Sequence, residues 1–178
     1  MSGTGPALVV VGPPASGKST VGAAVAQALG LPFRDTDADV EAQTGTTVAD
    51  LFVQQGEPHF RALEEQAVAR AMAEHDGVLA LGGGAVTSAA TRERLVAHGR
   101  AGRAVVWLDV DVTSAAKRVG LSRDRPLLAV NPRAMLRTML ETRAPLYAEV
   151  ATATVVTSAR PVEDVVADVL TAVGAGTP

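Results

Sequence analysis

A stretch of twelve residues, VVVGPPASGKST at positions 9–20, restricts the fold of this chain more than any other feature. An apolar run precedes a segment of the form G-x-x-x-x-G-K-S, and an alanine- and valine-rich helical run follows it. In such a segment the backbone turns so that successive N–H groups point at phosphate oxygens, and glycines allow both the turn and the close approach. The sequence therefore predicts a strand, a phosphate-binding loop and a helix in this order.

The same loop predicts what it binds. Lys18 is spaced to bridge the β- and γ-phosphates of a nucleoside triphosphate, and the Ser19 hydroxyl is placed to ligate Mg²⁺. The helix that begins near Gly17 adds the partial positive charge of its N-terminus. We expect the triphosphate to contact Ala15, Ser16, Gly17, Lys18, Ser19 and Thr20.

Short apolar runs alternate with helical patterns along the rest of the chain. Strands are predicted at residues 7–11, 77–81, 103–110 and 153–156, with a shorter one at 31–35. Helices are predicted at residues 18–29, 57–75, 88–98, 113–119, 132–142 and 162–173. This alternation favours the α/β class, with a mostly parallel sheet covered on both faces. No repeat or linker divides the chain, so residues 1–178 are expected to form one domain with its core at about 7–173.

Composition and charge exclude several classes of protein. No apolar run approaches the roughly 18 residues that a membrane-spanning helix needs. The net charge of −3 argues against nucleic acid or an anionic membrane as the main partner. Cysteine is absent, which excludes thiol nucleophiles, disulfides and zinc–thiolate sites. The first residues lack the basic and apolar regions of a signal peptide, so we expect a cytoplasmic protein.

An acidic cluster, RDTDAD at positions 34–39, follows the short strand. Ligands of such folds bind beyond the carboxyl ends of the strands, which favours a functional role for Asp35 and Asp37. Two carboxylates separated by one residue can diverge, one toward a metal ion and one toward a substrate. Asp39 is expected on the solvent-facing side of a helix, and Arg34 is expected to point to solvent.

Five further segments follow the loop in a specific order: FRDTDADVEAQTG, GEPHFRALE, LALGGGAV, SRDRPLL and ETRAPLY. With the loop, they resemble the shikimate kinases of the nucleoside-monophosphate-kinase-like branch, over about residues 7–173. The resemblance implies a three-layer P-loop kinase fold, with a five-stranded parallel sheet between helices. It also implies substrate-binding helices at about 35–63 and a mobile lid at about 119–130.

The activity implied by the resemblance is the phosphorylation of the 3-hydroxyl of shikimate by ATP, with Mg²⁺, in aromatic amino acid biosynthesis. Asp35 matches the family residue that holds Mg²⁺ together with Ser19. Asp37 matches the residue that contacts the substrate hydroxyls and accepts the proton of the attacking one. Arg125, in the lid, matches an arginine that moves onto the phosphates, and completes a catalytic set with Asp37 and Lys18. The implied partner is the small molecule alone, bound by a monomer.

The remaining site residues also follow from the resemblance. Arg61 and Arg143 match the pair of arginines that clamps the shikimate carboxylate. The glycine triplet matches backbone donors to the substrate, namely Gly82, Gly83 and Gly84. Arg118 and Arg160 match positions beside the adenine.

Residue chemistry independently supports part of this assignment. A carboxylate within hydrogen-bond reach activates an alcohol as a nucleophile, and a bidentate arginine suits a small carboxylic acid. Glu64 lies three residues after Arg61, where it can pair with the guanidinium on one helix face. One departure concerns the strand before the glycines, where Ala80 and Leu81 offer no polar side chain to support Mg²⁺.

Two other functions are compatible with a phosphate-binding loop. A kinase of the same fold could act on gluconate or another polyol acid, although the D-T-D, F-R and R-A-P-L-Y elements argue against this acceptor. A triphosphate-driven switch with a protein partner would need a water-positioning residue and a base-specificity motif such as N-K-x-D. We find neither in the sequence.

Overall fold

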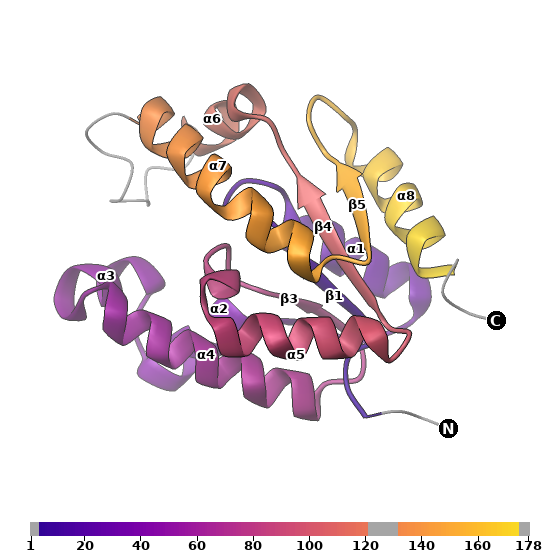
Figure 1. Cartoon of the computed structure of the whole chain (residues 1–178), viewed down its shortest axis with the longest axis horizontal. Coiled ribbons are helices and arrows are strands. Elements are labelled where there is room, and N and C mark those ends of the chain that lie inside the picture. The colour runs from indigo at the N-terminus through magenta and orange to yellow at the C-terminus, as the bar shows by residue number, and fades with distance from the viewer. Residues whose placement is uncertain (1–3, 121–131, 175–178) are drawn as a thin grey trace.

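The computed structural model describes residues 4–120 and 132–174 (Figure 1). Its strands form one parallel sheet in the order β2-β3-β1-β4-β5. The strands are β1 (Leu8–Val11), β2 (Phe33–Asp35), β3 (Val78–Ala80), β4 (Ala104–Asp109) and β5 (Ala153–Val156). The predicted five-stranded parallel sheet is confirmed, including the short strand at 31–35.

Helices cover both faces of this sheet, as the alternating pattern predicted. They are α1 (Lys18–Leu29), α2 (Thr36–Thr44), α3 (Val48–Gln55), α4 (Glu57–Glu74), α5 (Ala89–Arg100), α6 (Val112–Gly120), α7 (Pro132–Val150) and α8 (Val162–Gly174). A 3₁₀ turn, η1 (Ala85–Thr87), follows the glycine triplet. In the described part of the chain, none of the helices has the length and apolar character needed to cross a membrane.

Alternate residues of the buried strand β1 face opposite helical layers. Val9 and Val11 pack in one cluster with residues of α4, α5 and α7. Leu8 and Val10 pack in the other cluster with residues of α1 and α8. This division follows from the two-residue period of a strand, and it produces the three layers visible in Figure 1.

Two features of the helical pattern differ from the prediction. The helix predicted to end at residue 142 continues to Val150 as α7, with Pro145 inside it. A proline usually ends a helix because it removes one hydrogen bond and crowds the preceding turn. Here Tyr147 and Val150 lie beyond the proline and are both buried in the core, so burial of their side chains offsets this cost. Helix α3 has no counterpart among the helices predicted from the residue pattern, although it lies in the region 35–63 where the resemblance implied substrate-binding helices.

The site lies where the sheet places β1 beside β3. The two strands are parallel and in register, with Val10 opposite Ala80, so the loops that follow them leave the same edge of the sheet. A separate small cluster packs α2, α3 and α4 together through Val40, Leu51 and Phe60. The region predicted to bind substrate at 35–63 therefore stands beside the phosphate loop. Most of the predicted lid, at residues 121–130, lies outside the described residues.

We predict that Gly77→Ala destabilises the sheet where β2 and β3 begin to pair. A methyl group at position 77 would lie 2.0 Å from the carbonyl oxygen of Pro32, which also accepts the Val78 N–H at 2.9 Å. Because backbone atoms must move, we expect a loss of about 1–3 kcal/mol in the free energy of unfolding, measured by urea denaturation. Gly120→Ala is the control, since no atom of the described residues lies within 4 Å of a methyl group there. Equal unfolding midpoints for the two variants would contradict the prediction.

Candidate active site

The phosphate loop connects β1 to α1 in the predicted manner. Gly17 has φ of 88° immediately before the helix, a backbone region that favours glycine. Ala15 also has a positive φ, 66°, which is uncommon for alanine and costs backbone strain. The Lys18 ammonium group donates a hydrogen bond to the Pro13 carbonyl oxygen at 2.9 Å, so it lies folded along its own loop.

Asp35 joins the phosphate loop to the start of α2. The Ser19 hydroxyl donates to Asp35 Oδ2 at 2.7 Å. The other oxygen, Oδ1, accepts the backbone N–H of Asp37 at 2.9 Å and so caps the N-terminus of α2. One carboxylate therefore connects the helix that carries Asp37 to the loop that carries Lys18 and Ser19.

The donor atoms of this pair suit magnesium. A serine hydroxyl and a carboxylate are hard oxygen ligands, which Mg²⁺ prefers. Across residues 4–120 and 132–174, no group of three or more acidic or histidine side chains gathers to hold a metal. At the end of β3, Ala80 and Leu81 are both buried and apolar. A Mg²⁺ ion bound at Ser19 and Asp35 would thus complete its coordination with phosphate oxygens and water.

Three consecutive glycines after β3 bring the acidic, basic and phosphate-binding elements together. A methyl group on Gly82 would lie 2.6 Å from Asp37 Oδ1 and 2.5 Å from Glu64 Oε2. One on Gly83 would lie 2.8 Å from the ring of Pro14, in the phosphate loop. One on Gly84 would lie 2.2 Å from Arg61 Nη1. A side chain at any of these three positions would therefore clash with its neighbour, so each close approach depends on glycine.

Arg61 is held against the glycines by its own helix. Its guanidinium pairs with Glu64 at 2.7 Å and with Glu57 at 3.2 Å, and lies 5.3 Å from the ring centroid of Phe60. The predicted pairing of Arg61 with Glu64 is confirmed. Burial raises the pKa of the Glu64 carboxyl, and the charge of Arg61 opposes this shift.

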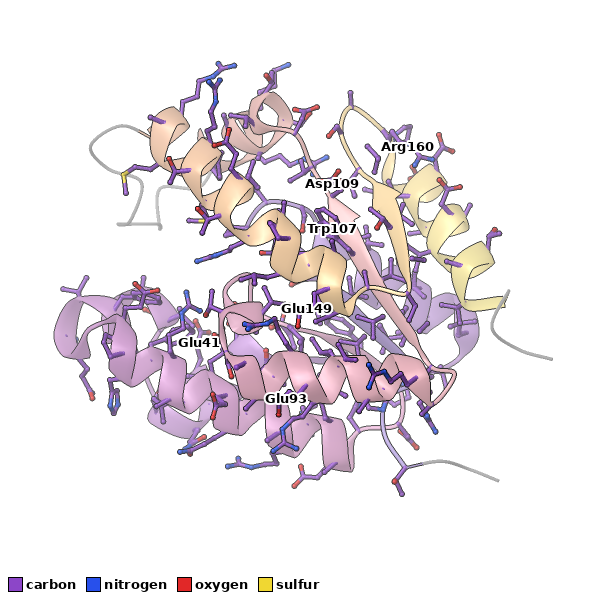
Figure 2. The ribbon with its side chains drawn as sticks, viewed as in Figure 1. Glu41, Glu93, Trp107, Asp109, Glu149 and Arg160 are labelled. Atoms are coloured by element: carbon purple, nitrogen blue, oxygen red, sulfur yellow. The ribbon has the colours of Figure 1, made fainter. Side chains whose placement is uncertain are left out.

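The other predicted arginines have different surroundings. Arg118 donates to the Ala15 carbonyl at 2.8 Å and to the Thr157 carbonyl at 3.0 Å, so it links the phosphate loop to the segment after β5. Arg160 instead pairs with Asp168 of α8 at 2.8 Å, and Figure 2 shows it beside that helix. In the described residues, the hydrogen bonds and ion pair of Arg160 are with Val156 at the end of β5 and with α8. Arg125 lies outside the described residues.

Arg143 stands on α7 one turn before Tyr147. The pKa of the Tyr147 hydroxyl is raised to about 12, chiefly by burial, while the charge of Arg143 opposes the shift. Burial also raises the pKa of Glu64, and the charge of Arg143 opposes this shift as well. Both effects need the Arg143 guanidinium within electrostatic range of Tyr147 and Glu64.

The outer residues of the acidic cluster differ from the expectation. Arg34 pairs with Asp39 at 2.7 Å and with Glu74, at the end of α4, at 3.3 Å. The side chains of Arg34 and Asp39 are 24% and 26% exposed, so neither simply points to solvent. An arginine in the edge strand β2 therefore forms ion pairs with both α2 and α4.

Sequence reasoning missed two contacts of the glycine triplet. The buried Thr36 accepts the Gly82 N–H through its hydroxyl oxygen at 3.2 Å. The buried Tyr147 donates its hydroxyl to the Gly83 carbonyl oxygen at 2.5 Å. Tyr147 is in the R-A-P-L-Y element, and Thr36 stands between the two aspartates, but neither position signals a partner 46 or 64 residues away.

We predict that Thr36→Val lowers the free energy of unfolding by about 1–3 kcal/mol, because the shape is retained while the buried Gly82 N–H loses its acceptor. Thr171→Val is the matched control, since that hydroxyl is exposed and bonds only to its own helix at Ala167. Thermal and urea unfolding of both variants measure the difference. The assignment fails if the two variants lose the same stability.

Comparisons with known proteins identify the family of this chain. Residues 14–174 match the family described as shikimate kinase. A shikimate kinase from Salinispora arenicola is 55% identical over 164 residues, which are 92% of this chain and 95% of that protein. One from Streptomyces avermitilis is 54% identical over 169 residues, covering 95% and 96% of the two chains. The solved structure of a shikimate kinase from Acinetobacter baumannii in complex with shikimate has a TM-score of 0.90 and 35% identity, and covers 99% of this chain and 96% of that one. The chain belongs to the shikimate kinase family.

Proposed function

We propose that this protein transfers the γ-phosphoryl group of ATP to the 3-hydroxyl of shikimate, giving shikimate 3-phosphate and ADP. The observation that carries the proposal is the convergence on three glycines: Asp37 at Gly82, the phosphate loop at Gly83 and Arg61 at Gly84. A base, a phosphate site and a cation for a carboxylate thus surround one short loop. The family relationship and the complex of the relative with shikimate support the acceptor.

In the proposed reaction, Asp37 acts on the attacking hydroxyl. Its carboxylate orients the 3-hydroxyl and accepts its proton, as the oxygen forms a bond to the γ-phosphorus and the bond to the β,γ-bridging oxygen breaks. Asp37 is in the first turn of α2, and Asp35 caps this turn. The cap fixes the start of the helix, and so it fixes where the Asp37 side chain can reach.

The phosphate loop orients the donor. Lys18 leaves the Pro13 carbonyl and pairs with the β- and γ-phosphates, which offer a stronger charge-assisted interaction than a neutral carbonyl. Ser19 and Asp35 hold Mg²⁺, which neutralises charge on the phosphate oxygens when it is bound. Arg118 supports the loop through the Ala15 carbonyl, on the side assigned to adenine. Arg125 remains the proposed lid arginine.

Two arginines receive the carboxylate of the acceptor. Arg61 is already fixed by Glu64 and Glu57, so little side-chain freedom is lost when it binds an anion. Arg143 supplies the second cation from α7. A planar guanidinium can form two parallel hydrogen bonds to one carboxylate, which a lysine cannot.

We also infer that the protein acts as a monomer in the cytoplasm. In the described residues the exposed large apolar side chains lie on five different elements: Leu29, Val53, Met135, Val156 and Val162. Such scattered side chains are usual on monomers.

Asp37→Asn is expected to lower kcat by at least 10²-fold, because an amide cannot accept the proton, while ATP still binds. A coupled assay with ATP, Mg²⁺ and shikimate measures the change. Asp39→Asn on the same helix is the control, because Asp39 pairs with Arg34, and its kcat should stay within about two-fold of the native value. Near-normal turnover by Asp37→Asn would remove the proposed base. If the native enzyme phosphorylates gluconate and not shikimate, the proposed function is wrong.

Arg143→Lys is expected to raise the KM for shikimate roughly ten-fold or more, because the charge is kept but the bidentate contact is lost. The KM for ATP should stay unchanged, since Arg143 is assigned to the acceptor alone. Initial rates measured with each substrate varied in turn separate the two constants. An equal rise in both values would place Arg143 outside the acceptor clamp.

A further inference from the structure

The only tyrosine of the chain is buried against its only tryptophan. Tyr147 on α7 and Trp107 on β4 stack with ring centroids 5.7 Å apart. The Tyr147 side chain is 1% exposed and packs in the cluster that also contains Leu81 and Ala85, on either side of the glycine triplet. The ring is therefore fixed by packing, and its hydroxyl is directed at the Gly83 carbonyl oxygen.

This hydrogen bond acts on the central peptide of a turn, which the Ala85 N–H closes by donating to the Gly82 carbonyl oxygen at 3.0 Å. The peptide between Gly83 and Gly84 has a glycine on each side, so no Cβ atom limits its rotation. The N–H and C=O of a trans peptide point in opposite directions, so a partner that holds the Gly83 carbonyl also directs the Gly84 N–H. Within the described residues, no backbone acceptor takes the N–H of Gly83 or Gly84. These two N–H groups are the hydrogen-bond donors that shikimate would meet.

The same hydroxyl lies near the acceptor clamp. Arg143 lies four residues before Tyr147, on the same face of α7, and its charge opposes the rise in the pKa of the hydroxyl. The hydroxyl donates its hydrogen bond to the Gly83 carbonyl oxygen. Its raised pKa, about 12, keeps it protonated, and so able to donate, throughout the physiological range.

We propose that Tyr147 is a positioning residue for the acceptor: its hydroxyl sets the Gly83–Gly84 peptide in the arrangement that receives shikimate. This inference rests on the proposed function, because it concerns the same site. Tyr147 does not touch the reacting atoms. It acts through the glycine loop, so its loss should weaken shikimate binding more than it slows the chemical step.

Tyr147→Phe tests the proposal, since it removes the hydroxyl and keeps the ring against Trp107. We expect the KM for shikimate to rise roughly five- to ten-fold, the consequence of leaving the Gly83 carbonyl without its donor. The KM for ATP and kcat should stay within about two-fold. The fluorescence of Trp107, the only tryptophan, provides a second measurement, because the shikimate Kd without ATP should rise by the same factor as KM.

Trp107→Phe is the control for packing, since it alters the stack but keeps the Tyr147 hydroxyl. Both variants should lower the melting temperature, and Trp107→Phe should leave the KM for shikimate unchanged. The proposal is overturned if Tyr147→Phe loses stability with an unchanged shikimate KM and Kd, or if both variants raise KM equally. Those results leave the proposed function standing. If the native enzyme does not phosphorylate shikimate, the proposed function fails and this inference fails with it.

Discussion

The absence of side chains at three consecutive positions is the constraint on which the site depends. Gly82, Gly83 and Gly84 let a carboxylate, a proline ring and a guanidinium approach the backbone more closely than any Cβ atom permits. The three neighbours come from α2, the phosphate loop and α4, which are far apart in the sequence. One short loop therefore sets the relative positions of the base, the phosphates and the clamp.

Such a loop needs stabilising contacts, because glycine loses more conformational entropy on folding than any other residue. The side chains that hold this loop are buried and come from widely separated parts of the sequence. Thr36 accepts from Gly82, and Tyr147 donates to Gly83. Leu81 and Ala85 anchor the two ends of the loop in the core. The backbone N–H groups of Gly83 and Gly84 therefore remain available to a ligand, and no side chain of the loop covers them.

The charges of the site are organised by ion pairs and hydrogen bonds, some between elements and some within α4. Asp35 joins the phosphate loop to α2, and Arg34 joins β2 to both α2 and α4. Glu64 holds Arg61 in place, although its burial raises its own pKa. These pairs fix the start of α2 and one face of α4. The two functional side chains, Asp37 and Arg61, lie on those elements.

Much of this arrangement was predictable from local patterns. The loop motif, the five strands and the pairing of Arg61 with Glu64 each follow from the spacing of residues that are close in sequence, and the structure confirms them. The exposure of Arg34 and Asp39 was predicted wrongly, because the sequence around a charged residue in an edge strand does not indicate which helix packs beside it. The continuation of α7 past Pro145 was missed because its stabilisation comes from the core and not from helix propensity.

The sequence by itself determined the family, the phosphate loop and the residue types that a kinase for an acidic alcohol needs. Each of these is specified by residues that are close together in short motifs. Only the tertiary structure decided which side chains meet at the glycines, that Arg160 pairs with α8, and that Thr36 and Tyr147 hold the loop. Apart from the pair of Arg160 with Asp168, those contacts join residues tens of positions apart. Their partners are chosen by strand order and helix packing, which no local pattern encodes.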